Sequence, residues 1–489
     1  MSEQPSGSPP PGPAPSLPFL PNVPEVEPPT LTGPQYATPG LAFAAAPPPK
    51  RTNWRRGLII ALIIAFIALC GIAVLVVIGW NGGITALVVG AGSAIIPVPF
   101  IVTCFLWLDR YEPEPLKYLA FVFAWGACVA TGGALLVNTI AGLEFKRLQI
   151  SDNLVAVIVA PIIEESMKAL GPILLFWVKR KAFSGIIDAI VYCGLSATGF
   201  AMVENILYLG VKGYATGVAE GGGALGGARN VVAFFIARIV LTGFAHPLFT
   251  SMTGIGLGIS IRASKKWLRI TAPFIGLLLA MTLHGSWNLM SVLSAKNPYV
   301  ILYGYFAVMM PIFLSVVTFA LWLRSSEGRL VERVLPDYVR AGWLSPPEVA
   351  ALATLGRRLS ARLWAKRVAG EAGAKAMKAF QFDATRLALL RDRVRRGVGI
   401  GTPAQVNETL VEEQQLLERL MAYRSVFIGR DPMTPRAVWD GMRYHVTFPD
   451  GVVRAVNPPV SPVLPVPVVL APVGYPPARG YPPPGYGYR

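Results

Sequence analysis

Long apolar stretches alternate with short polar connections along the middle of this chain. A helix needs about 20 mostly apolar residues to cross a bilayer. Eight stretches reach that length, at approximately 57–80, 84–108, 116–141, 153–178, 183–210, 231–261, 267–293 and 300–323. The pattern therefore predicts an all-α integral membrane domain of about eight transmembrane helices over residues 53–324.

Polar and Pro-rich segments flank this apolar region on both sides. Residues 1–52 are rich in Pro, and we expect them to be a disordered N-terminal region. Residues 325–456 are polar and basic and predict a mostly helical cytosolic extension; residues 457–489 are rich in Pro, Gly and Tyr and predict a disordered tail. Within the extension, the expected elements are helices at 346–372, 374–396 and 404–424 and a β-hairpin at 444–456.

Basic residues gather in alternate connections between the apolar stretches, which indicates the orientation of the chain. They are Lys50, Arg51, Arg55 and Arg56 before the first stretch, Lys179, Arg180 and Lys181 after the fourth, Arg262, Lys265, Lys266 and Arg269 after the sixth, and Arg324 and Arg329 after the eighth. Cytoplasmic loops carry such an excess of Lys and Arg. We therefore expect a multi-pass protein of the cell membrane with both termini in the cytoplasm, surrounded by the lipid bilayer.

Composition agrees with a membrane protein and argues against two other classes. Only 15% of residues are charged, against about 25% in soluble domains. The net charge is +17, but no basic stripe with interleaved aromatic residues or known nucleic-acid module accompanies it, so no nucleic-acid partner is expected. The four cysteines lie in apolar stretches without a CxxC pair, which argues against a disulfide framework or a zinc knuckle.

Ionisable side chains occur inside four successive apolar stretches, although each costs about 2.5–3.5 kcal/mol at a helix centre. Glu164 and Glu165 are adjacent in the fourth stretch, and Lys168 follows within reach of both from the same helix face. Such residues at membrane depth are candidates for function. Two adjacent carboxylates also exceed what one lysine neutralises.

The next three stretches carry the remaining candidates. Phe200 and Glu204 lie one turn apart in the fifth stretch. His246 in the sixth stretch is followed directly by a proline that is expected to kink the helix. His284 and Asn288 share a face of the seventh stretch. Two of the three histidines of the chain thus lie in spanning helices beside the glutamates.

These residue types suit the hydrolysis of a peptide bond. A glutamate can act as a general base, and two histidines with one glutamate are a common catalytic zinc set that leaves a position for water. The residues permit either a metal-bound water, with Zn²⁺ as the expected ion, or a water held by glutamate. We expect Glu164 or Glu165 as the base with Asn288 positioning water or an oxyanion, Glu204, His246 and His284 as ligands of metal or water, and Lys168, Arg238, Phe200 and Asn205 in support.

No HExxH or GxSxG motif is present, which argues against the usual zinc-protease helix and against a serine mechanism. The motifs that are present resemble those of the PrsW family of bacterial intramembrane proteases, which is similar to the type II CAAX prenyl endopeptidases. The resemblance rests on EExxK at 164–168, FxxxE at 200–204 followed by Asn205, His284 to Asn288 with Asn in place of the family's Asp, and DRYEPEP at 109–115. It covers approximately residues 57–324.

The resemblance implies an intramembrane endopeptidase of the metallo- or glutamate type, which cleaves membrane-anchored protein substrates within or near the bilayer in regulated proteolysis. In the family, the substrates include an anti-sigma factor. Two other functions fit the residues. An ion- or proton-coupled transporter would use the same groups as a relay, and an inactive protease-like scaffold would bind partners through residues 325–489.

Overall fold

The structure is a computed structural model that describes residues 54–340, 343–344, 346–398, 402–427, 437–440, 442–447, 452–457 and 469–470. The predicted disordered N-terminal region lies outside the described residues, as does the predicted tail except for residues 457 and 469–470. The chain divides into two units, Met1–Leu58 and Ile59–Arg489. The first unit is described only over residues 54–58, so nearly all of the described residues belong to the second.

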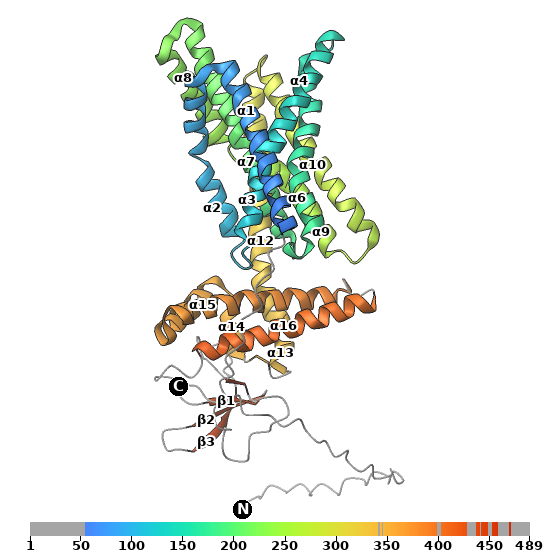
Figure 1. Ribbon diagram of the computed structural model, residues 1–489, viewed down its shortest axis with the longest axis vertical. Helices are drawn as coiled ribbons and strands as arrows, with labels where there is room; N and C mark the ends of the chain where they lie inside the picture. The colour runs from blue at the N-terminus through green and yellow to red at the C-terminus, as the bar shows by residue number, and fades with distance from the viewer. Residues whose placement is uncertain are drawn as a thin grey trace, which may run out of the picture. The chain divides into compact units, whose positions relative to one another are not determined.

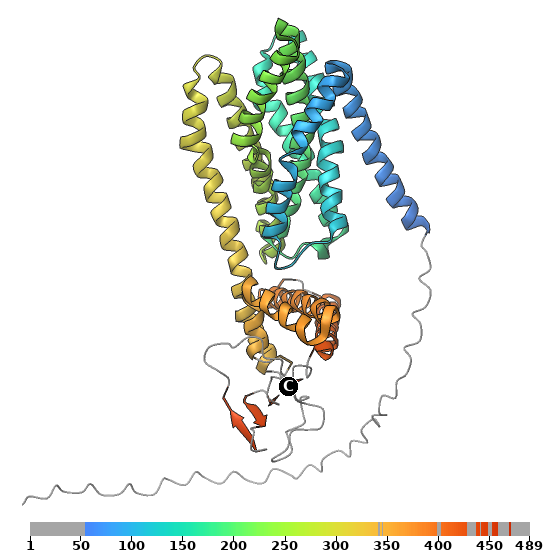
Figure 2. The same ribbon diagram turned by 90° about the vertical axis from the view of Figure 1, so that its left-hand side faces the viewer.

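Helices form the apolar part of the chain, and the longer ones run beside one another as a bundle (Figures 1 and 2). The α-helices are α1 (Trp54–Ile95), α2 (Val98–Leu108), α3 (Leu116–Ala124), α4 (Thr131–Arg147), α5 (Asp152–Leu154), α6 (Ala160–Val178), α7 (Ile186–Ile206), α8 (Gly223–Phe235), α9 (Ala245–Arg262), α10 (Lys266–Ser294), α11 (Tyr299–Gly304) and α12 (Met310–Val334). Segments with wider π-helical turns connect several of them, namely η1 (Trp125–Ala130), η2 (Val155–Val159), η4 (Leu207–Ala215), η5 (Val218–Gly222), η6 (Ile236–Leu241) and η7 (Tyr305–Met309), and a 3₁₀ turn, η3 (Arg180–Ala182), follows α6.

Among the residues that the structure describes, five helical segments are long and apolar enough to cross a membrane: Gly57–Leu108, Leu116–Arg147, Ile186–Arg262, Lys266–Ser294 and Tyr299–Val339. The chain is therefore an all-α, multi-pass membrane protein, as predicted. Two of these segments have 52 and 77 residues, well beyond the length of about 20 that one crossing requires. Helix α6 is not among the five, and it carries three charged residues, Glu164, Glu165 and Lys168. The figure of about eight crossings stays a prediction.

Large apolar side chains cover the outside of the bundle. Leu62 on α1 is 60% exposed and Leu278 on α10 is 63% exposed, and many neighbours on the same helices are similar. Exposed apolar surface on this scale is unusual for a soluble protein. It is the surface that lipid chains cover.

Helix α7 is the centre of the bundle, and most of its side chains are buried. Small residues allow other helices to approach its backbone closely. A Cβ atom on Gly126 of η1 would lie 1.8 Å from the carbonyl oxygen of Ser196, and one on Gly199 would lie 2.1 Å from that of Phe123. Close packing through glycine is typical of membrane helices. It fixes the rotation of α7 and of the neighbouring helices that carry the ionisable side chains.

The extension after α12 contains α13 (Pro336–Arg340), α14 (Pro346–Leu352), α15 (Leu355–Arg395) and α16 (Pro403–Phe427). Helices α15 and α16 lie side by side (Figure 1) and share a buried apolar core that includes Trp364, Phe380 and Leu416. Gly370 has a φ of 63°, which breaks α15 near the boundary between two predicted helices. The predicted helices at 374–396 and 404–424 are thus confirmed in the described residues, whereas the one predicted over 346–372 is divided between α14 and the first part of α15.

A buried arginine joins the extension to the connection between α2 and α3. Arg358 donates hydrogen bonds to the carbonyl oxygens of Tyr111 (3.2 Å) and Leu352 (2.7 Å) and to the hydroxyl of Thr385 (2.7 Å). The Tyr111 hydroxyl in turn donates to the carbonyl of Ala353 at 3.4 Å. The connection 109–115 is therefore held by α15 as well as by the membrane helices.

A small sheet follows the helices, with the strand order β3-β2-β1-β4. Its strands are β1 (Ala437–Trp439), β2 (Tyr444–Thr447), β3 (Val453–Val456) and β4 (Val469–Leu470). Strands β2 and β3 pair in antiparallel fashion, with Tyr444 opposite Val456, which confirms the predicted hairpin. Strand β4 is parallel to β1 and lies within the tail that was predicted to be disordered.

Candidate active site

The two adjacent glutamates of α6 occupy different environments. The Glu165 side chain is fully buried, whereas Glu164 retains 11% exposure and lines a cavity. Lys168, one turn later and also fully buried, places its Nζ 2.8 Å from Glu165 Oε1 and 3.4 Å from Glu164 Oε2. The helical spacing predicted that this lysine reaches both carboxylates. A buried charge without such a partner would be strongly destabilising.

His284 on α10 contacts the buried carboxylate. Its Nδ1 lies 2.9 Å from Glu165 Oε1, and the Thr250 hydroxyl on α9 donates to Glu165 Oε2 at 2.7 Å. A carboxylate can only accept hydrogen bonds, so Nδ1 is the donor and Nε2 is the ring nitrogen that faces away from Glu165. That Nε2 lies 3.8 Å from Glu164 Oε2. Glu165 therefore orients His284 toward Glu164.

His246 on α9 has a second carboxylate partner. Its Nε2 lies 2.8 Å from Glu204 Oε2 on α7, and Arg238 donates to the same oxygen at 2.7 Å. Arg238 also donates to Oδ1 of Asn205 at 3.1 Å. By the same argument His246 is protonated on Nε2, and its other nitrogen, Nδ1, lies 3.0 Å from Lys168 Nζ. Arg238, expected to support the site, thus contacts both Glu204 and Asn205.

Three side chains in this cluster are placed to hold a metal ion. One ligand atom from each of Glu164, His246 and His284 lies within 4.8 Å of the others. Two imidazoles and one carboxylate are a common catalytic zinc set. Each histidine has its second ring nitrogen on a carboxylate, the arrangement that orients metal ligands in proteins. The donor set therefore fits a zinc-type ion.

The predicted ligand set differs from this group in one member. Glu204 was expected to be a ligand, and the structure places it beside Arg238 and His246, which both contact its Oε2. Glu164, expected to be a base, lies in the three-residue group instead. The role of Glu204 as a ligand stays a prediction, and its contacts favour a role in orienting His246.

A cavity of about 310 Å³ opens onto these groups. Its polar lining includes Glu164, Glu204, His246, His284 and Asn288, and its apolar lining includes Val74, Leu135, Phe200 and Trp287. Asn288 donates to the carbonyl oxygen of Ala156 in η2 at 2.8 Å. The Phe200 ring lies 4.0 Å from Lys168 Nζ, so it contacts the lysine through a cation–π interaction. The lining thus combines apolar side chains with the ionisable groups of the site.

Three residues of the site were not anticipated from the sequence. Thr250 bonds Glu165, Asn138 donates to Glu164 Oε1 at 3.4 Å, and the Phe249 ring stacks on the His284 ring with centroids 5.4 Å apart. Thr250 follows His246 by four residues, so it shares that face of α9. Asn138 is a polar residue within an apolar stretch. The roles of Thr250 and Asn138 could therefore have been predicted from the sequence, whereas the stacking of Phe249 depends on how α9 packs on α10.

Comparison with known proteins agrees with this geometry. The family model described as PrsW family intramembrane metalloprotease matches residues 114–316. The curated Protease PrsW of Clostridioides difficile (strain 630) is 27% identical over 218 residues, which cover 43% of this chain and 84% of the relative. Protease PrsW of Geobacillus kaustophilus (strain HTA426) is 28% identical over 195 residues, which cover 38% and 74%.

No solved structure gives a significant match to this chain. The family match contains α6, α7, α9 and α10, the four helices that carry Glu164, Glu204, His246 and His284. It ends before the helical extension begins. Over residues 114–316, this chain is similar to the PrsW family of intramembrane metalloproteases.

Proposed function

We propose that this intramembrane peptidase cleaves membrane-anchored proteins in the cavity bordered by Glu164, His246 and His284. One observation carries the proposal. Each histidine has one ring nitrogen on a buried or half-buried carboxylate, Glu165 or Glu204, and a ligand atom of each histidine lies within 4.8 Å of one of Glu164. The other nitrogen of His246, Nδ1, lies 3.0 Å from Lys168 Nζ, so an ion bound there would replace this hydrogen bond.

Zn²⁺ is the ion that we propose for this centre, held by His246, His284 and Glu164. When bound, it would polarise water and the substrate carbonyl. Glu165 and Glu204 are the positioning residues, because each accepts the N–H of one histidine and so fixes the orientation of its ring. Lys168 contacts both α6 carboxylates and neutralises one of their two negative charges.

We propose that Glu164 contributes to the ion site through Oε2, the oxygen 3.8 Å from His284 Nε2, and that its other oxygen, Oε1, accepts the proton of the attacking water. Its Oε1 accepts one long hydrogen bond of 3.4 Å from Asn138 and belongs to the cavity lining. Glu165 is poorly suited to this role, since Lys168, His284 and Thr250 already donate to its two oxygens. Asn288, also in the lining, stays the group proposed to position water or the oxyanion.

The substrates that we propose are proteins anchored by a single spanning helix, and cleavage would take place in regulated proteolysis. A cavity among helices of the membrane bundle, lined by apolar as well as polar groups, supports this class. A membrane-anchored anti-sigma factor is the first candidate, on the basis of the family resemblance. The excess of basic residues in alternate connections supports an orientation with both termini in the cytoplasm.

The test is the cleavage of a panel of single-span proteins reconstituted with the purified full chain. Wild type should cleave at least one substrate, and Glu164→Gln should lose at least about 100-fold in rate, the usual contribution of a general base. Glu144→Gln is the matched control, because Glu144 lies on α4 and its carboxylate is paired only with the exposed Arg147 among the described residues. Equal rates for wild type and Glu164→Gln would refute the assignment.

A further inference from the structure

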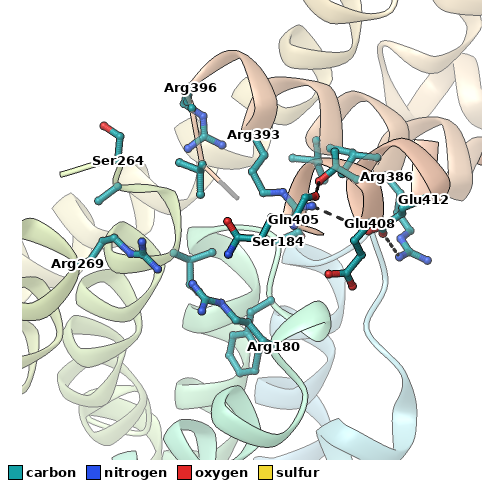
Figure 3. Close-up of a pocket in the computed structure, with 18 of the residues that line it drawn as sticks. Arg180, Ser184, Ser264, Arg269, Arg386, Arg393, Arg396, Gln405, Glu408 and Glu412 are labelled. Carbon is teal, nitrogen blue, oxygen red and sulfur yellow. Dashed lines mark hydrogen bonds and ion pairs between the residues drawn. The ribbon is translucent and has the colours of Figure 1, made fainter. Parts of the chain in front are cut away.

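A second cavity, of about 500 Å³, lies away from the histidines. It is lined by η3 and the residues after it, by the end of α9 and the start of α10, and by α15 and α16 (Figure 3). Cavities that bind small molecules have volumes of about 300–1,000 Å³. This cavity is therefore large enough for a ligand.

Arginines dominate the charged lining of this cavity. They are Arg180, Arg269, Arg386, Arg393 and Arg396, all labelled in Figure 3. Within the part of the chain that the structure describes, Arg180 and Arg269 have no ion-pair partner. Burial, and then the positive charges of Arg269 and Arg393, lower the pKa of the Arg180 guanidinium. The guanidinium groups are thus close enough to repel one another.

The carboxylates of the lining leave much of this charge uncompensated. Glu412 is shared by Arg386 (3.2 Å) and Arg393 (3.9 Å), and Arg396 pairs outside the lining with Asp392. Glu112 accepts a hydrogen bond from Ser184, and burial followed by the charge of Asp188 raises its pKa to about 8. Glu112 Oε1 also lies 4.0 Å from Arg386 Nε. Glu112 and Glu412 therefore both pair with Arg386, and neither pairs with Arg180 or Arg269. Glu408 is the third glutamate of the lining.

We propose that this cavity binds a phosphate-bearing anion, either the headgroup of an anionic phospholipid or a soluble phosphate compound. Guanidinium groups match the oxygen geometry of phosphate better than other cations do, because each presents a planar set of donors. An anion would also relieve the repulsion around Arg180 and Arg269, which no carboxylate among the described residues pairs. Basic pockets at the ends of membrane helices are known to hold lipid headgroups.

Two arginines of the cavity lie beside the ends of membrane helices, which places the cavity near lipid. Arg180 follows the end of α6 at Val178 by two residues, and Arg269 lies in the opening turn of α10. Trp177 is 71% exposed and Trp267 is 61% exposed. Exposed tryptophans near helix ends are typical of the membrane–water interface, so a lipid headgroup can reach the guanidinium groups.

The test compares ligand binding by the full-length protein in detergent. Native mass spectrometry measures bound phosphatidylglycerol against phosphatidylcholine, and thermal unfolding at constant ionic strength measures stabilisation by inorganic phosphate. In Arg180→Gln/Arg269→Gln, the preferred probe should bind about 30-fold more weakly, since each basic residue near a charged surface contributes roughly fivefold. Arg180→Lys/Arg269→Lys, which keeps the charge, should recover part of the affinity.

Arg367→Gln/Lys375→Gln is the matched control, because both residues lie on α15 and neither lines the cavity. If wild type and the control variant retain phosphatidylglycerol selectively and only the Arg180→Gln/Arg269→Gln variant loses it, the result supports a lipid headgroup. If phosphate stabilises wild type and the control variant but not the Arg180→Gln/Arg269→Gln variant, and wild type shows no lipid preference, the result supports a soluble ligand. If neither probe binds wild type selectively, or if the control variant loses as much, the proposal is overturned.

Discussion

Replacing Glu165 by glutamine tests whether this buried carboxylate positions His284 for metal binding and catalysis. The two oxygens of Glu165 accept from Lys168 Nζ (2.8 Å), His284 Nδ1 (2.9 Å) and Thr250 Oγ1 (2.7 Å), and the side chain is fully buried. A glutamine has one accepting oxygen, and its amide would meet another donor. Removing one partner of a buried ion pair costs about 3–5 kcal/mol, and loss of a residue that orients a metal ligand costs about 10–100-fold in affinity or activity.

The assay measures zinc affinity by competition titration and cleavage of a reconstituted single-span substrate in the same preparations. We expect Glu165→Gln to lose at least about tenfold in both, together with a lower unfolding temperature. Thr250→Val is the graded comparison, because it removes one hydrogen bond to a charged group, worth about 1.5–3 kcal/mol, and leaves the carboxylate in place. If Glu165→Gln kept both the affinity and the rate of wild type, the positioning role of this carboxylate would be refuted.

Three other substitutions probe separate parts of the molecule. Glu204→Gln should lower the cleavage rate about 10–100-fold by releasing the ring of His246, and an unchanged rate would contradict that role. Gly126→Ala should destabilise the protein by about 1–3 kcal/mol through its clash with the backbone of α7, measured as a lower unfolding temperature than that of Gly142→Ala, whose added Cβ meets nothing within 4 Å. The pKa of Glu112 is about 8 in the folded protein and about 4.3 in the unfolded chain. The free energy of unfolding should therefore fall as pH rises between these values, because the unfolded chain releases the proton first. Measured by chemical denaturation, this fall should be less steep in Glu112→Gln.

Much of the membrane domain was predictable because its signals are local. Runs of about 20 apolar residues mark spanning helices whatever surrounds them. The spacing of Glu164, Glu165 and Lys168 places all three within reach on one helix, and the structure confirms both contacts of the lysine. The helices of the extension and the hairpin were likewise visible in local periodicity.

What the sequence could not supply depends on how helices rotate against one another. Glu204 contacts His246 and Glu164 faces His284 because α6, α7, α9 and α10 pack in one particular rotation, to which the close approach of α7 and η1 at Gly126 and Gly199 contributes. No local sequence pattern predicts that rotation. The cavity lined by arginines could not be predicted from the sequence for the same reason. Arg180, Arg269 and Arg393 are far apart in the sequence and meet only because α15 packs near the ends of the membrane helices.

The measurement that tests the central claim most directly is the zinc content of purified full-length protein together with its cleavage activity, for wild type, His246→Ala, His284→Ala and His445→Ala. His445 is the third histidine of the chain and lies in the hairpin, where its Nε2 is 2.7 Å from Asp440. The account predicts about one zinc per active chain, as expected for a single catalytic site, with both zinc and activity lost in His246→Ala and His284→Ala and retained in His445→Ala. Full cleavage by wild-type protein without bound metal, or undiminished zinc and activity in His284→Ala, would contradict it.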